Sequence, residues 1–324
     1  MPRYQAPWWL PGGHLQTIYP YFFLKPQVPS YRRERWETPD GDFIDLDWMI
    51  QERNTPGPLV ALFHGLEGSS RSHYASALMR AVTRAHWRGV VIHFRGCSGE
   101  PNRLPRAYHS GDADEIAWIL QRLRTLNQDS PLFAAGVSLG GNALLKWLGR
   151  ERTAARETID GAAAVSAPLD LMTSGDRLGA GLNRFYGLHF LQSLKIKSLA
   201  KLERFPGLYD GAVVSNARTL REFDNVVTAP LHGYRDTDDY WQRASSKADL
   251  RGIAVPTLIV HARNDPFLPG RHLPSAGEVS ASVTLDFPDG GGHAGFASAP
   301  FPGNLDWLPQ RLLEFFAACI AAER

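Results

Sequence analysis

One serine in this 324-residue chain stands in a setting that can make its hydroxyl a nucleophile. Gly136-Val137-Ser138-Leu139-Gly140 fits the pattern G-x-S-x-G, between an expected strand at 132–135 and an expected helix at 140–150. A sharp strand-to-helix turn strains the serine backbone, and the glycines let neighbouring chain pass without Cβ clashes. The helix N-terminus then offers amides to an anion. We therefore predict that Ser138 is a nucleophile.

A hydroxyl attacks well only when a base removes its proton, and histidine is the usual base. Among 11 histidines, His293 follows the last expected strand, in the glycine-rich segment 289–296 (DGGGHAGF). Such a loop can bring an imidazole close to the serine, so we predict that His293 is the base. His272, in a loop, and His261, on a strand, are weaker candidates.

The base needs an acid that orients it and stabilises the imidazolium. Asp265 comes just after the expected strand 257–260, at the same edge of the sheet as Ser138, and the chain order serine, acid, histidine is typical of this kind of turn. We predict Asp265 as the acid. Asp289, four residues before His293, and Asp286, within a strand, are rivals. A turn aspartate before a proline is the alternative role for Asp265.

A tetrahedral intermediate of acyl transfer needs N–H donors for its oxyanion. One predicted donor is the amide of Leu139, directly after the nucleophile. The other is the amide of Leu66, in the segment 63–68 (FHGLEG) that follows the first buried strand. Gly65 and Gly68 permit a tight, inward-facing loop there. An ordinary turn is the alternative.

Other motifs are weak or absent from the sequence. The segment 109–114 contains H-x4-D, an acyltransferase-like pattern, but it precedes a helix and Asp112 is expected to cap that helix. No P-loop lysine, complete G-x-G-x-x-G, C-x-x-C or H-E-x-x-H occurs, so we predict no cofactor and no metal. With two cysteines there is no disulfide framework, and Cys97 is expected to pack as a small apolar residue.

Short apolar runs alternate with helical stretches, which favours a parallel sheet with helices as crossovers. The expected core strands are 59–63, 90–94, 132–135, 162–165, 257–260 and 283–287, and the expected helices are 72–86, 112–126, 140–150 and 304–321. Segments 33–38 and 43–50 read as a hairpin whose second strand is half-buried, because its apolar residues alternate. Asp112 and Glu115 form a capping-box pattern. We predict an α/β fold with a mostly parallel central sheet of about eight strands.

The alternation stops at Pro168 and resumes at residue 257. We therefore predict a core of residues 33–168 and 251–324, interrupted by a mainly helical cap or lid at 169–250. Residues 1–32 are rich in proline and aromatic side chains and are expected to wrap the core as an irregular arm. A membrane-surface patch is the alternative for this arm, but the amphipathic helical period that it would need is absent.

Length and composition agree with one interrupted core. The chain is longer than one minimal core of roughly 200–250 residues and short for two. Its 35 basic and 33 acidic residues give a net charge of +2, which argues against nucleic acid as a partner. Neither a signal peptide nor a membrane-spanning segment is expected, so the cytoplasm is the predicted location.

Seven short strings are spread over most of the chain: 13–17 (GHLQT), 64–70 (HGLEGSS), 95–100 (RGCSGE), 108–111 (YHSG), 136–142 (GVSLGGN), 228–234 (TAPLHGY) and 291–296 (GGHAGF). With them the chain resembles the YheT-like branch of the α/β-hydrolase superfamily, which includes eukaryotic α/β-hydrolase-domain lipases. The resemblance implies a carboxylesterase-type serine hydrolase with a relay of Ser138, Asp265 and His293. Two consecutive aspartates are associated with the acid turn of this family. Here Asn264 replaces the first, and Asp265 is the second.

On this basis we expect cleavage of a small-molecule ester or acyl lipid through an acyl-enzyme. Lysophospholipase, monoacylglycerol lipase or thioesterase activity would use the same residues, and a catalytically silent binding module is the alternative outside enzymes. Aromatic and aliphatic residues of the insertion would line an acyl pocket or pack the lid on the core: Phe185, Tyr186, Leu188, Phe190 and Leu194. The substrate and the oligomeric state stay open, with a monomer favoured.

Overall fold

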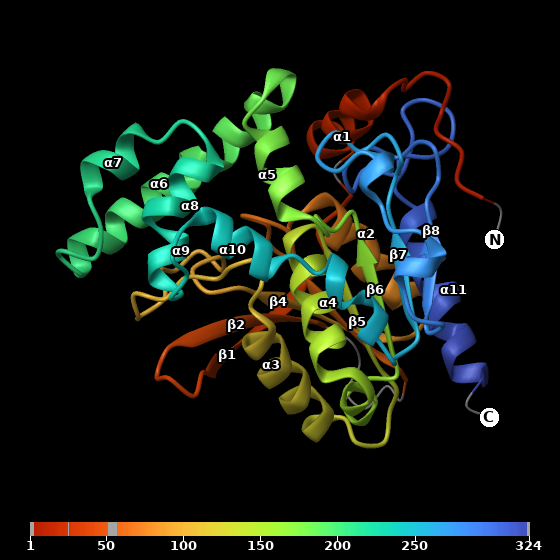
Figure 1. The fold of residues 1–324 in the computed structure, drawn as a ribbon. Coiled ribbons are helices and arrows are strands. Elements are labelled where there is room, and N and C mark those ends of the chain that lie inside the picture. The colour runs from red at the N-terminus through yellow and green to blue at the C-terminus, as the bar shows by residue number, and fades with distance from the viewer. Residues whose placement is uncertain (1–2, 25, 51–56, 323–324) are drawn as a thin grey trace.

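The computed structural model describes residues 3–24, 26–50 and 57–322 (Figure 1). Met1, Pro2 and Lys25 of the expected arm lie outside the described residues. Within them, eight strands form one sheet in the order β1-β2-β4-β3-β5-β6-β7-β8. Strands β1 and β2 pair antiparallel with their neighbours, and the pairs from β4 to β8 are parallel. The predicted fold class is confirmed.

The strands are β1 (Tyr31–Glu37), β2 (Phe43–Met49), β3 (Leu59–Phe63), β4 (Arg88–His93), β5 (Leu132–Val137), β6 (Gly161–Val165), β7 (Thr257–Val260) and β8 (Val283–Asp286). The helices outside the insertion are α1 (Gly13–Phe22), α2 (His73–Arg84), α3 (Ala113–Leu126), α4 (Leu139–Glu151) and α11 (Trp307–Ala322), with 3₁₀ turns at Arg152–Glu157, Lys247–Gly252, Gly270–His272 and Ala276–Glu278. The last helix begins three residues later than expected.

Helices cover both faces of the central strands, whose side chains alternate between the two faces. In β3, Leu59, Ala61 and Phe63 join the core under α3 and α4, while Val60 and Leu62 join the core under α2 and α11. This two-sided burial explains why the parallel strands are continuous apolar runs.

The half-buried character predicted for β2 is wrong. Its polar face is buried as well, with Asp45 2% and Asp47 4% exposed. Arg35 and Arg33 of β1 each donate two hydrogen bonds, to Asp45 and Asp47 respectively. Asp47 also accepts from the Ser70 hydroxyl at 2.6 Å. The carboxylates are tolerated inside because each is paired and hydrogen-bonded.

The arm expected at residues 1–32 is not irregular throughout, because residues 13–22 form α1. This helix has no side-chain N-cap and carries Pro20 in its interior. Local propensity therefore does not explain it. Its buried residues are Gln16, Thr17 and Pro20, which indicates that tertiary contacts hold the helix.

Residues 171–244 form six helices with a small core of their own, drawn in green and cyan in Figure 1. They are α5 (Leu171–Leu178), α6 (Arg184–Arg204), α7 (Gly211–Asn216), α8 (Leu220–Val226), α9 (Thr228–Leu231) and α10 (Thr237–Ala244), with a 3₁₀ turn at Gly181–Asn183. Among the residues described, no helix is long and apolar enough to cross a membrane.

Helix α3 begins as predicted after Asp112, whose side chain accepts from the amide of Glu115 at 3.4 Å. The reciprocal half of the expected capping box is missing. The Glu115 carboxylate instead accepts from Arg95 at 2.5 Å. A buried guanidinium competes successfully for this carboxylate because charge-assisted hydrogen bonds are the stronger ones.

Candidate active site

Ser138 lies between the end of β5 and the start of α4, with φ 53° and ψ −120°. This conformation is rare for a residue with a Cβ and marks a strained turn. A Cβ on Gly136 would meet the Gly140 carbonyl oxygen at 2.5 Å, and one on Gly140 would meet the Phe63 carbonyl oxygen at 2.5 Å. Glycine is therefore required on both sides of the serine.

The three predicted polar residues lie in one hydrogen-bonded row, although they come from three segments. His293 Nε2 is 2.9 Å from Ser138 Oγ, and His293 Nδ1 is 2.9 Å from Asp265 Oδ2. Asp265 is 1% exposed and lies in the turn after β7. Its other oxygen accepts from the amide of Phe267 at 2.7 Å. The arrangement can move a proton from the serine to an imidazole whose orientation is fixed.

The charge on Asp265 is stabilised by its partners. Burial alone would raise the pKa of this carboxyl, but the neighbouring His293 and a hydrogen bond from His261 outweigh it and hold the pKa well below its usual range. Asp265 is therefore ionised at neutral pH, as a group that stabilises an imidazolium must be.

The rival candidates occupy other positions, and among them His261 contacts the row through Asp265. His261 is buried behind Asp265, with Nε2 3.3 Å from Oδ2 and 3.1 Å from the Leu268 carbonyl oxygen. Asp286 pairs with Arg311 at 2.7 Å, and the side chain of Asp289 is 86% exposed. His272 accepts a hydrogen bond from Arg271 at 3.0 Å.

Leu66 and Leu139 line the same cavity as Ser138 and His293. The amides on either side of Leu66 are held by tyrosine hydroxyls, Gly65 by Tyr74 and Glu67 by Tyr108, both at 2.9 Å. A Cβ on Gly65 would meet the Ser138 Cβ at 3.1 Å. This loop is thus fixed against the serine, as an oxyanion site requires.

The cavity has a volume of about 550 Å³ and is mostly apolar. The insertion contributes Phe190 and Leu194, as expected for an acyl pocket. Phe185 and Leu188 do not line it and are 73% and 47% exposed. Tyr186 instead packs edge-on against Phe267, at a ring separation of 4.9 Å.

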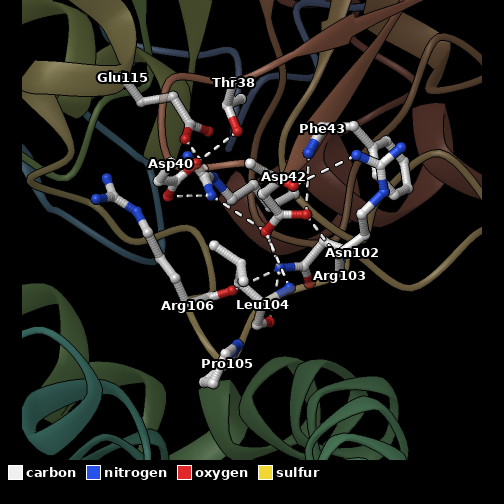
Figure 2. Close-up of polar contacts among 12 residues, drawn as sticks. Thr38, Asp40, Asp42, Phe43, Asn102, Arg103, Leu104, Pro105, Arg106 and Glu115 are labelled. Carbon is white, nitrogen blue, oxygen red and sulfur yellow. Dashed lines mark hydrogen bonds and ion pairs between the residues drawn. The ribbon is translucent and has the colours of Figure 1, made fainter.

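Figure 2 shows a polar network around Asp42 and Asn102. Three of its members, Arg95, Asn102 and Lys201, also line the cavity. Asp42 is fully buried and accepts from the Asn102 side chain at 2.6 Å and from Arg95 at 3.1 Å. Lys201 of α6 donates to Asn102 Oδ1 and to the carbonyl oxygens of Leu104, Pro105 and Arg106. These bonds attach the insertion to the core.

The two ends of the H-x4-D string are separated. Asp114 pairs with Arg150 on the surface, with its side chain 83% exposed. His109 is buried and packs against the ring of His232 at 4.2 Å. Burial lowers the pKa of His109 to about 3, so this ring is neutral. The string serves packing and capping, with Asp112 as the helix cap.

Cys97 lines the cavity, and burial raises the pKa of its thiol to about 12. It is therefore a poor nucleophile at neutral pH. Among the described residues, no group of three or more His, Cys, Asp or Glu side chains could hold a metal ion.

Sequence reasoning missed several residues that support the row. Tyr74 and Tyr108 hold the Leu66 loop, and the ring of Phe267 packs at a tilt against the His293 ring, with a centroid separation of 4.1 Å. Gln16 and Thr17 of α1 contact the His293 loop. No spacing rule links these residues to the site, although Tyr108, Gln16 and Thr17 fall within the strings shared with the YheT-like branch.

Comparison with known proteins identifies the family and agrees with the fold. Residues 58–300 match the model of the α/β hydrolase fold family. The chain is 38% identical over 313 residues to "Putative esterase YheT" of Escherichia coli, covering 96% of this chain and 92% of that protein. It is 28% identical to human "Phospholipase ABHD3", covering 98% and 79%. An esterase structure from Pyrococcus furiosus superposes with a TM-score of 0.59 at 16% identity, covering 93% and 98%. The chain belongs to the α/β-hydrolase family, in the branch that contains YheT.

Proposed function

We propose that this hydrolase is a serine carboxylesterase whose triad is Ser138, His293 and Asp265. The class, a hydrolase related to esterases and lipases, follows from its family and relatives. The observation that carries the finer proposal is the continuous row from Ser138 Oγ through the His293 ring to Asp265, with both contacts at 2.9 Å.

In this mechanism His293 takes the Ser138 proton as Oγ attacks the ester carbonyl carbon. The amides of Leu66 and Leu139 stabilise the oxyanion, and Asp265 stabilises the imidazolium. His293 then protonates the leaving alkoxide, which departs as the alcohol and leaves an acyl-enzyme. Water, deprotonated by His293, releases the acid and restores the serine.

The mostly apolar cavity supports an ester with an apolar acyl chain as the substrate. Helices α5 to α10 act in this proposal as a cap that closes the cavity and shapes the acyl pocket. Relatives named as a phospholipase and as a monoacylglycerol lipase support an acyl-lipid substrate.

Replacement of Ser138 tests the proposal. Ser138→Ala is expected to reduce kcat for a short p-nitrophenyl ester by roughly 10⁴–10⁶-fold, because the nucleophile is lost. Ser215→Ala, which removes an exposed hydroxyl of α7, is the control and should retain full turnover. Near wild-type turnover by Ser138→Ala would refute the assignment.

Turnover by the wild type and by the same two variants should also be measured on a panel of oxygen esters and thioesters with matched acyl chains. A carboxylesterase should prefer the oxygen esters, whereas preference for the thioesters would indicate a thioesterase. A catalytically silent binding module would hydrolyse neither series.

A further inference from the structure

The loop that carries His293 is held by side chains rather than by secondary structure. Four consecutive amides, from Gly291 to Ala294, each donate to a side-chain oxygen of a different residue. These bonds are Gly291 to Gln16 Oε1 at 2.7 Å, Gly292 to Asn264 Oδ1 at 3.0 Å, His293 to Thr17 Oγ1 at 2.9 Å and Ala294 to Ser166 Oγ at 3.0 Å. The loop is thus fixed amide by amide.

Two of these four acceptors come from α1, more than 270 residues away in sequence. Gln16 Oε1 also accepts from Asn264 Nδ2 at 2.9 Å, and Gln16 Nε2 donates to the Leu10 carbonyl oxygen at 2.7 Å. Gln16 therefore links the His293 loop to the turn that carries Asp265. Asn264 completes this link as both donor and acceptor, a combination that an ionised aspartate could not provide.

Thr17 acts at the histidine itself. Its hydroxyl accepts from the His293 amide and donates to the Gly13 carbonyl oxygen at 2.7 Å, so both of its bonding roles are used. The backbones meet closely here, because a Cβ on Gly295 would lie 1.9 Å from the Gln16 carbonyl oxygen. A Cβ on Gly13 would lie equally close to the Asn264 carbonyl oxygen.

Apolar burial does not explain why α1 lies here. The helix turns Gln16 and Thr17 inward, while Leu15 and Phe22 are 50% and 54% exposed. An amphipathic helix that served only the core would do the reverse. The inward face of α1 is instead matched to donors of the two loops that carry His293 and Asp265.

We propose that Gln16 and Thr17 are positioning residues for the reaction, which hold the imidazole of His293 in line with Ser138 and Asp265. The proposal rests on the proposed triad. Gln16 fixes the distance between the loop that carries His293 and the turn that carries Asp265. Thr17 fixes the position of the His293 backbone relative to α1. Both act through His293 and neither contacts Ser138.

Thr17→Val tests this most directly, because valine keeps the shape of threonine and removes only the hydroxyl, with its bonds to the His293 amide and the Gly13 carbonyl oxygen. We expect kcat for a p-nitrophenyl ester to fall roughly 10–100-fold, the usual effect of a small misplacement, with little change in KM. The rate of fluorophosphonate labelling of Ser138 should fall in parallel. Thr17→Ser keeps the hydroxyl and should restore both rates.

Tyr19→Phe is the matched control. This substitution also removes one hydroxyl of α1, which donates to the Pro302 carbonyl oxygen. Unlike Thr17, the Tyr19 hydroxyl makes no hydrogen bond to the His293 loop. The kcat of Tyr19→Phe should stay within about twofold of wild type. Thermal unfolding of all variants, followed by assays well below each Tm, separates a positioning effect from lost stability.

The outcomes distinguish this inference from the proposed function. Wild-type rates in Thr17→Val beside an inactive Ser138→Ala would overturn the positioning role and leave the triad intact. An active Ser138→Ala would overturn both. Equal losses in Thr17→Val and Thr17→Ser, or in Tyr19→Phe, would show that α1 has a structural role only.

Discussion

At the residue scale, Asp265 is the most constrained member of the proposed triad. It accepts from the Phe267 amide, contacts both His293 and His261, and is almost fully buried. A neutral amide at this position would keep the shape but remove the charge that stabilises the imidazolium, and it would offer an N–H to a ring nitrogen that needs an acceptor.

Asp265→Asn is therefore expected to lower kcat by roughly 10³–10⁴-fold, as in other triads that lose their acid. Steady-state kinetics on a p-nitrophenyl ester measure this loss. Asp289→Asn is the control, because Asp289 lies close to His293 in sequence but its side chain is 86% exposed. A larger loss in Asp289→Asn than in Asp265→Asn would reverse the assignment of the acid.

The residues of the row were predictable because each follows a strand at the same edge of the sheet. G-x-S-x-G gives the serine, and the glycine-rich loop after the last strand gives His293. Gln16 and Thr17 were not predictable from physical patterns. They act through hydrogen bonds to backbone amides, which leave no period in the sequence, and they lie in a segment whose aromatic composition suggested surface packing.

At the element scale, α6 is tied to the core by Lys201. Burial lowers the pKa of this lysine to about 8, although its ammonium donates to four oxygens. A lysine whose pKa falls on folding binds fewer protons in the folded than in the unfolded state between pH 8 and its ordinary pKa of about 10.4. Its contribution to stability therefore rises with pH across that window.

Comparison with Lys201→Met isolates this effect. The free energy of unfolding of the wild type, relative to the variant, should increase from pH 8 to pH 10, as measured by urea unfolding. Lys195→Met removes a half-exposed lysine of the same helix that donates to the Ser215 carbonyl oxygen, and it should show no such trend. A difference between wild type and Lys201→Met that stays constant or falls with pH would contradict the desolvation of this ammonium.

Most elements were predictable, because parallel strands buried on both faces leave continuous apolar runs. Two of the errors have a common cause. Strand β2 buries Asp45 and Asp47 against arginines of β1, and α1 buries Gln16 and Thr17 against a loop. In both places a polar face is turned inward and satisfied by partners distant in sequence, which hydrophobic periodicity cannot detect.

At the scale of the whole molecule, a cavity of about 550 Å³ lies between the strand ends that carry Ser138 and His293 and the helices of the insertion. The insertion was visible in the sequence as a break in the strand and helix alternation. Its contribution to the cavity was visible only in part, since Phe190 and Leu194 line the cavity while Phe185 and Leu188 are exposed. Such assignments depend on how the six helices pack, and α6 has apolar residues on several sides.

The central claim is that Ser138, which lines this cavity, becomes covalently modified during acyl transfer. The most direct measurement is mass spectrometry of the intact protein and its peptides after treatment with a fluorophosphonate probe. The proposed triad predicts one adduct per chain, located on Ser138 and absent in Ser138→Ala. An unlabelled wild-type protein, or an adduct on another residue that persists in Ser138→Ala, would contradict it.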